Sequence, residues 1–235
     1  MRRALALVSV LALAACTGAG GPRGPGGRSP MLRPSANPGQ VVATELSFAR
    51  TAREKGQRAA FAEYSAKSAL IFAPGPVPVQ RWLKEKKGAE AQLSWAPYQI
   101  WSSCDGSVAV SKGGWTLPDG QVGYFVTVWQ RQQDGAYKWL VDFGDTLAQP
   151  LTEPDLVQTD VADCPARLPG GPRPSEISLS PVAADGLSGS ATDGSLSWQV
   201  EVAPDFARTI RVSLRHEAGM EEVLSSAASA PGRAQ

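Results

Sequence analysis

The stretch from residue 92 to residue 147 constrains the fold most, because strand-forming segments alternate there with turn residues. The segments are rich in Trp, Tyr and Val, which favour pleated, half-buried surfaces. They cover residues 92–103, 107–117, 122–133 and 136–147. The turns between them are Asp105-Gly106, Pro118-Asp119-Gly120 and Asp134-Gly135. This spacing predicts an antiparallel meander of four strands.

Helical signals precede the meander. Asn37-Pro38 combines an N-cap residue with a proline suited to the first helical turn, and Gly56 predicts the end of that helix. Its expected buried stripe consists of Val42, Leu46, Ala49 and Arg53. Two more helices are expected over 58–66 and 79–87. Helices followed by strands predict an α+β fold.

The chain after the meander divides into two parts. Residues 150–175 are rich in proline and predict a connector. Residues 176–235 predict a small β-rich extension with a frayed end, with strands over 196–202, 209–216 and 221–225. Because three strands need a covered face, this extension either packs on the main domain or forms a poorly stable appendage.

Four pieces in order resemble a nuclear transport factor 2-like domain of the SnoaL or ketosteroid-isomerase-like kind. They are residues 69–76, a strand ending near Asp105-Gly106, residues 123–132 with Asp134-Gly135, and residues 137–144. The resemblance implies a cone-shaped domain over 38–149, with N-terminal helices packed in a curved antiparallel sheet and a pocket at the open end. It says little about activity, because this fold hosts enzymes, carriers and dimerisation modules.

The first sixteen residues have the pattern of a targeting signal. Arg2 and Arg3 precede an apolar run over 4–14, which is too short to cross a bilayer and suits a cleaved secretion signal. Leu13-Ala14-Ala15-Cys16 resembles the bacterial lipobox, which implies a signal peptide over 1–15 and a lipid on Cys16. The alternative is an ordinary signal with a chance cysteine.

The lipobox resemblance implies a periplasm-facing protein held to a bacterial membrane through Cys16. Thr17 replaces the aspartate that resembles an inner-membrane retention signal, which favours the outer membrane. The following residues, up to 37, are rich in Gly and Pro and predict a flexible tether between membrane and domain.

Charge and cysteine content narrow the possible functions. The net charge is +1, and removal of Arg2 and Arg3 leaves 1 − 2 = −1. The chain therefore has no excess of basic residues that would bind the phosphate backbone of a nucleic acid. Once Cys16 carries lipid, Cys104 and Cys164 remain and predict a disulfide in an oxidising compartment, with two buried thiols as the alternative. The sequence has a single histidine and no cluster of Cys or His residues with the spacing of metal ligands. We therefore expect no metal site and no cofactor.

Asp142 is the candidate for chemistry. It lies between Val141 and Phe143 in the last strand of the meander. Burial there raises the pKa of a carboxyl group towards values useful for a general base or a hydrogen-bond donor. The alternative is a structural carboxylate that accepts hydrogen bonds from backbone or indole N–H groups.

Aromatic side chains are the candidates for binding a small apolar ligand. The five are Tyr64, Trp95, Tyr98, Trp101 and Trp129. Trp95 and Trp101 share parity, so one strand face is expected to carry both. Trp129 and Trp139 flank a turn and are expected to be cross-strand neighbours. The alternative for all of them is core packing.

These observations favour a protein that binds a small apolar ligand or a protein partner without catalysing a reaction. The first alternative is an isomerase, dehydratase or hydrolase that uses Asp142. The second is an assembly module that forms a homodimer through its sheet.

Overall fold

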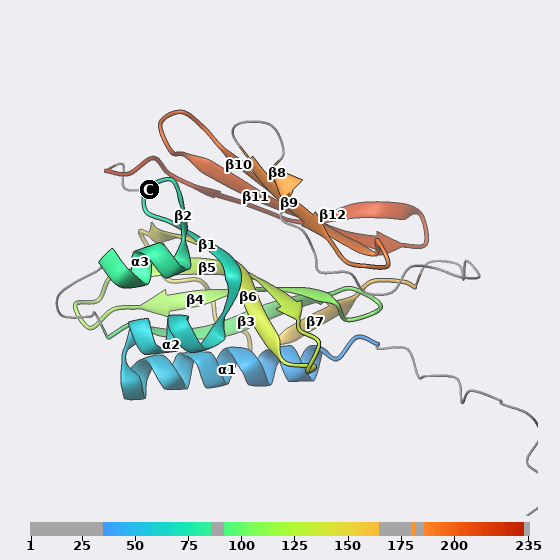
Figure 1. Ribbon diagram of the computed structural model, residues 1–235, viewed down its shortest axis with the longest axis horizontal. Helices are drawn as coiled ribbons and strands as arrows, with labels where there is room; N and C mark the ends of the chain where they lie inside the picture. Colours follow the sequence, from blue (N-terminus) through green and yellow to red (C-terminus); the bar gives the residue numbers. More distant parts are fainter. Residues whose placement is uncertain (1–34, 86–91, 165–179, 182–185, 233–235) are drawn as a thin grey trace, which may run out of the picture. The chain divides into compact units, whose positions relative to one another are not determined.

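Figure 1 shows the computed structural model, which describes residues 35–85, 92–164, 180–181 and 186–232. The expected signal peptide, the expected lipidation site Cys16 and most of the expected tether lie outside these residues. Much of the expected connector also lies outside them. The described residues all belong to one compact unit.

The fold is mostly β: strands account for 49% and helices for 19% of the structure. The helices are α1 (Pro38–Lys55), α2 (Gln57–Tyr64) and α3 (Val79–Glu85). A seven-stranded sheet has the order β2-β1-β6-β5-β4-β3-β7, and a five-stranded sheet has the order β12-β11-β10-β9-β8. We call them the large sheet and the second sheet.

The strands of the large sheet are β1 (Ser65–Phe72), β2 (Pro76–Pro78), β3 (Ser94–Ser102), β4 (Val108–Thr116), β5 (Val122–Arg131), β6 (Tyr137–Leu147) and β7 (Gln158–Val161). Those of the second sheet are β8 (Ser180–Pro181), β9 (Gly186–Ser190), β10 (Leu196–Val202), β11 (Arg208–His216) and β12 (Gly219–Ala228).

The predicted fold class, an α+β cone of helices packed in a curved antiparallel sheet, is therefore wrong. The large sheet is mixed, because β1 runs parallel to β6 and β7 runs parallel to β3. What was expected to be a small extension is a complete second sheet. Alternating strands and turns in the sequence predict only hairpins between neighbouring strands. A strand that pairs in parallel comes from a distant segment, so local sequence patterns do not predict it.

The first helix begins where the sequence predicts. The Asn37 side chain accepts a hydrogen bond from the backbone N–H of Gln40 at 3.1 Å, and Pro38 occupies the first turn. Gly56 ends the helix with φ at 92°, a value that side chains with a Cβ avoid.

The buried face of α1 differs from the expected stripe. The buried residues include Val41, Glu45, Phe48 and Ala49, so Ala49 is buried as expected, whereas Leu46 is 49% exposed. The stripe is therefore rotated by about one residue from the prediction. The predicted stripe contains three apolar residues and Arg53, whereas the buried face contains the carboxylate of Glu45, which the sheet accommodates.

The four meander strands, β3 to β6, fall within the predicted segments, but two irregularities shift their registers. One lies between Pro97 and Gln99 in β3, where it pairs with β4. The other is Leu140 in β6, since Val128 of β5 pairs with Val141 and Trp129 pairs with Trp139. Each extra residue reverses which face of the sheet the following side chains occupy.

The C-terminal strands pack on the main domain, which was the first of the two alternatives expected from the sequence. Lys112 Nζ lies 3.1 Å from Ser226 Oγ, and the Tyr124 hydroxyl donates to the Ala227 carbonyl at 2.6 Å. The second sheet also has buried apolar residues of its own, namely Leu196, Trp198, Val200, Ile210, Val212 and Leu214. The two sheets therefore belong to one folded unit.

Candidate functional site

A row of polar residues crosses the large sheet on the face that packs against α1. Ser111 in β4 pairs with Thr127 in β5, and Thr127 pairs with Asp142 in β6. The row continues to Ile100 on one side and to Ile71 on the other. Paired residues on neighbouring strands share a face. Three polar side chains thus lie side by side between apolar neighbours.

Asp142 lies at one end of this polar row. The Thr127 hydroxyl donates to Asp142 Oδ1 at 3.2 Å. Burial raises the pKa of the Asp142 carboxyl to about 7, and the bond from Thr127 opposes that rise. The residue as a whole is nevertheless only partly buried. Near neutral pH it can therefore hold or release a proton.

Glu45 reaches the polar row from α1 and is completely buried. Its carboxylate accepts hydrogen bonds from Trp95 Nε1 at 2.9 Å, from Trp129 Nε1 at 3.0 Å and from Ser111 Oγ at 2.7 Å. Trp129 Nε1 also lies 2.9 Å from Ser111 Oγ. Both indole N–H groups and the hydroxyl are therefore satisfied inside the domain.

The pKa of Glu45 is raised to about 7, chiefly because burial removes water from the carboxylate. The bonds from Ser111, Trp95 and Trp129 favour the charged form and oppose the rise. The negative charge of Asp142 adds to it. The two acids thus lie close enough to influence each other's protonation, as coupled carboxylates do.

Aromatic rings fill the space around Glu45. Phe48 lies 4.9 Å from Trp95, 5.2 Å from Tyr64 and 6.0 Å from Trp129, measured between ring centroids. Three of the five predicted ligand-binding residues thus surround one phenylalanine of α1. Their rings pack against the chain's own helix, the arrangement expected of a core.

The other two predicted binding residues lie on the opposite face of the large sheet. Trp101 pairs with Val110, the neighbour of Ser111, so it points away from α1. Tyr98 lies over Gly114, where an added Cβ would be 2.8 Å from its hydroxyl. The expectation that Trp95 and Trp101 share a face fails because of the irregularity between Pro97 and Gln99. Trp129 and Trp139 are direct cross-strand partners, as expected.

An open cavity of about 660 Å³ lies where the two sheets meet. Its lining comes from the ends of β1 and β6, the start of β11 and the segment after β12. The lining residues are Phe72, Pro74, Asp145, Thr146, Arg208, Ser229, Ala230, Pro231 and Gly232. Asp145 holds the final segment in place, since its Oδ2 accepts the Ser229 N–H at 2.7 Å.

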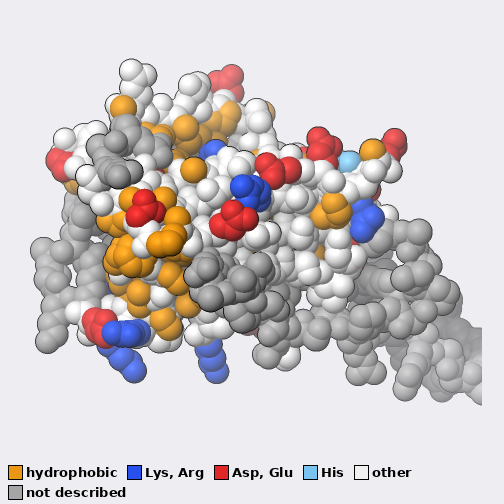
Figure 2. Space-filling view, turned by 90° about the horizontal axis from the view of Figure 1, so that it is seen from above, with side chains coloured by type: hydrophobic (Ala, Val, Ile, Leu, Met, Phe, Trp, Pro, Cys, Tyr) orange, Lys and Arg blue, Asp and Glu red, His pale blue; other side chains and the backbone are white. Residues whose placement is uncertain are grey.

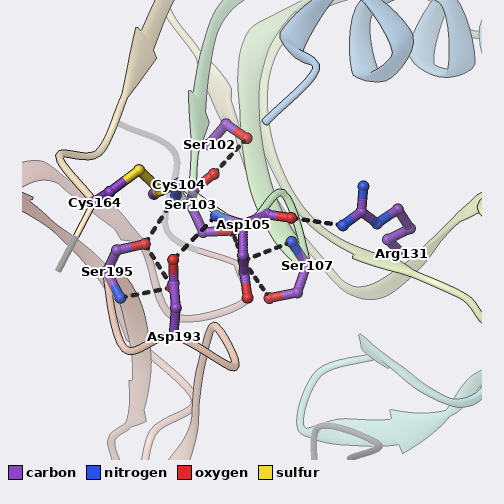
Figure 3. Close-up of a disulfide and its surroundings, with 9 residues drawn as sticks. All are labelled: Ser102, Ser103, Cys104, Asp105, Ser107, Arg131, Cys164, Asp193 and Ser195. Atoms are coloured by element: carbon purple, nitrogen blue, oxygen red, sulfur yellow. Dashed lines mark hydrogen bonds between the residues drawn. A yellow bond between two sulfur atoms is a disulfide. The ribbon is translucent and has the colours of Figure 1, made fainter. Parts of the chain in front are cut away.

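Cys104 and Cys164, the pair expected from the sequence, form a disulfide (Figure 3). The surrounding bonds join the turn after β3 to the turn before β10. The Cys104 N–H donates to Ser195 Oγ at 2.9 Å, and the Asp105 N–H donates to Asp193 Oδ2 at 3.0 Å. Because backbone groups and short polar side chains satisfy one another here, the cluster is a structural joint between the sheets.

The surface in Figure 2 carries acidic and basic side chains interspersed, beside one area where hydrophobic side chains gather. Among the described helices, none combines the length and apolarity that a membrane crossing requires. Within the same ranges, no group of three His, Cys, Asp or Glu residues is arranged to hold a metal ion.

Sequence reasoning missed four residues of these sites: Glu45, Ser111, Thr127 and Arg208. A signal for Glu45 exists, because it interrupts the apolar spacing between Val41 and Phe48 while tryptophans follow downstream. Ser111 and Thr127 give none, since Ser and Thr are common on exposed strand faces. Arg208 gives none, because only the meeting of distant strands places it beside Phe72.

Comparisons with known proteins add little. No protein-family model matches the chain, and no curated protein matches it. A solved structure of a "putative aromatic ring hydroxylase" from Novosphingobium aromaticivorans is similar over 48% of this chain and 91% of that one, with 11% identity and a TM-score of 0.34. At that score the likeness carries no argument about fold or activity. The resemblance to nuclear transport factor 2-like domains stays a prediction.

Proposed function

We propose that this chain is a lipid-anchored envelope protein that binds a small molecule, without transforming it, in the cavity between the two sheets. The cavity of about 660 Å³ carries this proposal, since small-molecule sites are usually concave and have volumes in this range. The filled interior supports it further. Glu45, Phe48 and the tryptophans occupy the space between α1 and the large sheet that the family resemblance offers for a pocket.

The anchored location rests on the lipobox resemblance at Cys16 and on the tether behind it. We propose a periplasm-facing position, with the outer membrane favoured by Thr17. The test is metabolic labelling with palmitate in a bacterial host. The unchanged chain should incorporate label and sediment with membranes, and Cys16→Ser should do neither. A labelled Cys16→Ser variant would overturn the proposal.

Ligand binding is tested by calorimetry on the full chain carrying Cys16→Ser, against a panel of small ring compounds. Thr146 is exposed and lines the cavity, so Thr146→Trp should block the cavity and abolish the binding heat. Thr116→Trp is the matched control, because Thr116 is exposed at the end of β4 and is absent from the cavity lining. Equal binding by both variants would remove the cavity as the site.

The polar row favours one second candidate, acid–base catalysis at Asp142. Its carboxyl group has a pKa of about 7, which suits proton transfer at neutral pH, and the residue as a whole is only partly buried. A screen for isomerisation, dehydration or hydrolysis of small carbonyl compounds tests it. Any turnover found should disappear in Asp142→Asn, which keeps the shape and removes the titration. Turnover that persists in Asp142→Asn would exclude Asp142 as the catalytic group.

We propose monomeric action over assembly through the sheet. Lys112 and Tyr124, on the sheet face that an assembly would use, already contact Ser226 and Ala227 of the same chain. Sedimentation of the full Cys16→Ser chain tests this. A concentration-dependent dimer would favour the assembly alternative.

A further inference from the structure

Among the described residues, the guanidinium of Arg208 enters the cavity wall without a carboxylate in ion-pair contact. Its Nη2 donates to the Gly144 carbonyl at 3.0 Å, and its Nη1 makes a long bond of 3.4 Å to the Phe206 carbonyl. Its Nε is buried and has no hydrogen-bond partner among the described residues. A guanidinium has five N–H donors, so these contacts leave most of them unused.

Aromatic rings, rather than acids, hold the guanidinium in place. Its central carbon lies 5.1 Å from the centroid of Phe72 and 5.5 Å from that of Phe143. Such contacts attract a cation to a ring face but do not neutralise its charge. Burial lowers the pKa of Arg208, while the negative charge of Asp145 opposes that shift. An arginine remains charged at any physiological pH.

Asp145 is the acid nearest to this charge, but its oxygens are engaged elsewhere. Oδ1 accepts the Thr146 N–H at 2.8 Å, and Oδ2 accepts the Ser229 N–H at 2.7 Å. No ion pair joins Asp145 to Arg208 within the part of the chain that the structure describes. Two backbone donors thus occupy the carboxylate oxygens, and the charge of Asp145 acts on the guanidinium only from a distance, beside an open cavity.

We propose that the cavity recognises a small molecule bearing an anionic carboxylate or phosphate group on an apolar, ring-shaped body. The inference rests on the small-ligand function proposed above and adds the ligand's chemical class. The anionic group accepts hydrogen bonds from Arg208, which suits planar oxyanions. The apolar body lies against Phe72, Pro74 and Pro231. Asp145 faces the same space and disfavours a second negative group.

The test compares matched probes by calorimetry on the full chain carrying Cys16→Ser. Phenylacetate is compared with phenylacetamide, and phenyl phosphate with phenol. Each anion should bind about tenfold or more tightly than its neutral counterpart, because a charge-assisted bond contributes about 1.5–3 kcal/mol. Added salt should reduce this preference, since screening weakens the attraction.

Two variants and a matched control locate the effect. Arg208→Gln should remove the preference for the anion, and Arg208→Lys should keep part of it because the charge remains without the planar fork. Arg211→Gln should change nothing, since Arg211 lies on the same strand and pairs with Glu201 at the surface, 2.9 Å away. Urea unfolding of each variant shows whether it is folded. If Arg208→Gln does not fold, the reduced preference of Arg208→Lys for the anion tests the inference instead.

The outcomes separate the two proposals. Equal binding of anions and neutral compounds overturns the inference and leaves small-ligand binding intact. If neither class binds, and no compound in the wider panel does, the proposed function itself fails. Arg208-dependent sedimentation with phosphatidylglycerol vesicles, without binding of the soluble probes, would assign the anion to a lipid headgroup and overturn the soluble ligand.

Discussion

The two faces of the large sheet differ in how far the hydrogen-bonding groups of their buried polar side chains are satisfied. On the face towards α1, Glu45 has three side-chain donors, all from the sheet that it covers. On the face towards the second sheet, Arg208 contacts two carbonyl groups and two rings, and its Nε has no hydrogen-bond partner among the described residues. The first arrangement closes an interior, whereas the second leaves a charge available to a ligand. For this reason we propose the binding site on the face towards the second sheet and not on the face towards α1, where Trp95 and Trp129 lie.

The largest expected effect comes from removing the carboxylate of Glu45. Glu45→Ala leaves the Trp95 indole N–H and the Ser111 hydroxyl without their acceptor in a closed interior, while the Trp129 N–H keeps Ser111 Oγ, so the free energy of unfolding should fall by about 3–5 kcal/mol. Urea unfolding followed by tryptophan fluorescence measures it. Glu45→Gln keeps one acceptor oxygen and should cost less. A loss of under about 1 kcal/mol in Glu45→Ala would mean that the network contributes little.

The disulfide should rank next. Cys104 and Cys164 are separated by 60 residues, and closing a loop of that length stabilises the folded state by about 4 kcal/mol in the chain-entropy model. Replacing both cysteines by serine should lower the unfolding free energy by a comparable amount. Reduction of the unchanged chain with a thiol reagent should give the same value. A reduced chain as stable as the oxidised one would contradict the prediction.

Protonation of Glu45 makes the closed interior sensitive to pH. Its pKa rises from 4.5 to about 7 on folding, so between those values the folded state binds more protons than the unfolded state. Stability should therefore be greatest at the acidic end of this window and decline by about 3 kcal/mol as pH rises through it. Asp142 adds a decline in the same direction.

Urea unfolding over a pH series measures this decline. Glu45→Gln should flatten the curve, because its amide does not titrate. Parallel curves for the variant and the unchanged chain would show that Glu45 does not carry the pH dependence.

A smaller effect should come from the face towards the second sheet. Tyr124→Phe removes the bond to the Ala227 carbonyl and should cost about 1 kcal/mol, the usual net value of one hydrogen bond. Because the bond holds the end of β12, hydrogen exchange should quicken in residues 224–228 more than in β5. Unchanged exchange in β12 would indicate that other contacts hold the second sheet in place.

The smallest effect tests the register of α1. Leu46 is 49% exposed beside the buried Glu45, so Leu46→Glu should change the unfolding free energy by less than about 0.5 kcal/mol. The same urea experiment compares it directly with Glu45→Ala. A large loss in Leu46→Glu would restore the stripe expected from the sequence.

Local patterns predicted a good part of the fold. The turn dipeptides and alternating residues located β3 to β6, and the Asn37 cap located the start of α1. The pairing of Trp129 with Trp139 follows from the turn between them. These features are predictable because neighbouring residues determine them. The irregularity at Pro97 carries no comparable signal, and it was enough to move Trp101 to the other face of the sheet.

Local patterns in the sequence were sufficient to predict the hairpins, the start and end of the first helix and the pair of cysteines suited to a disulfide. The mixed sheet, the contact between Glu45 and the polar row, and the place of Arg208 beside Phe72 follow only from the folded chain. The two groups of features differ in the distance along the chain over which their interactions act. Turns, caps and alternation act between residues close in the chain, whereas parallel pairing and the joining of two sheets depend on segments that meet only when the whole chain folds.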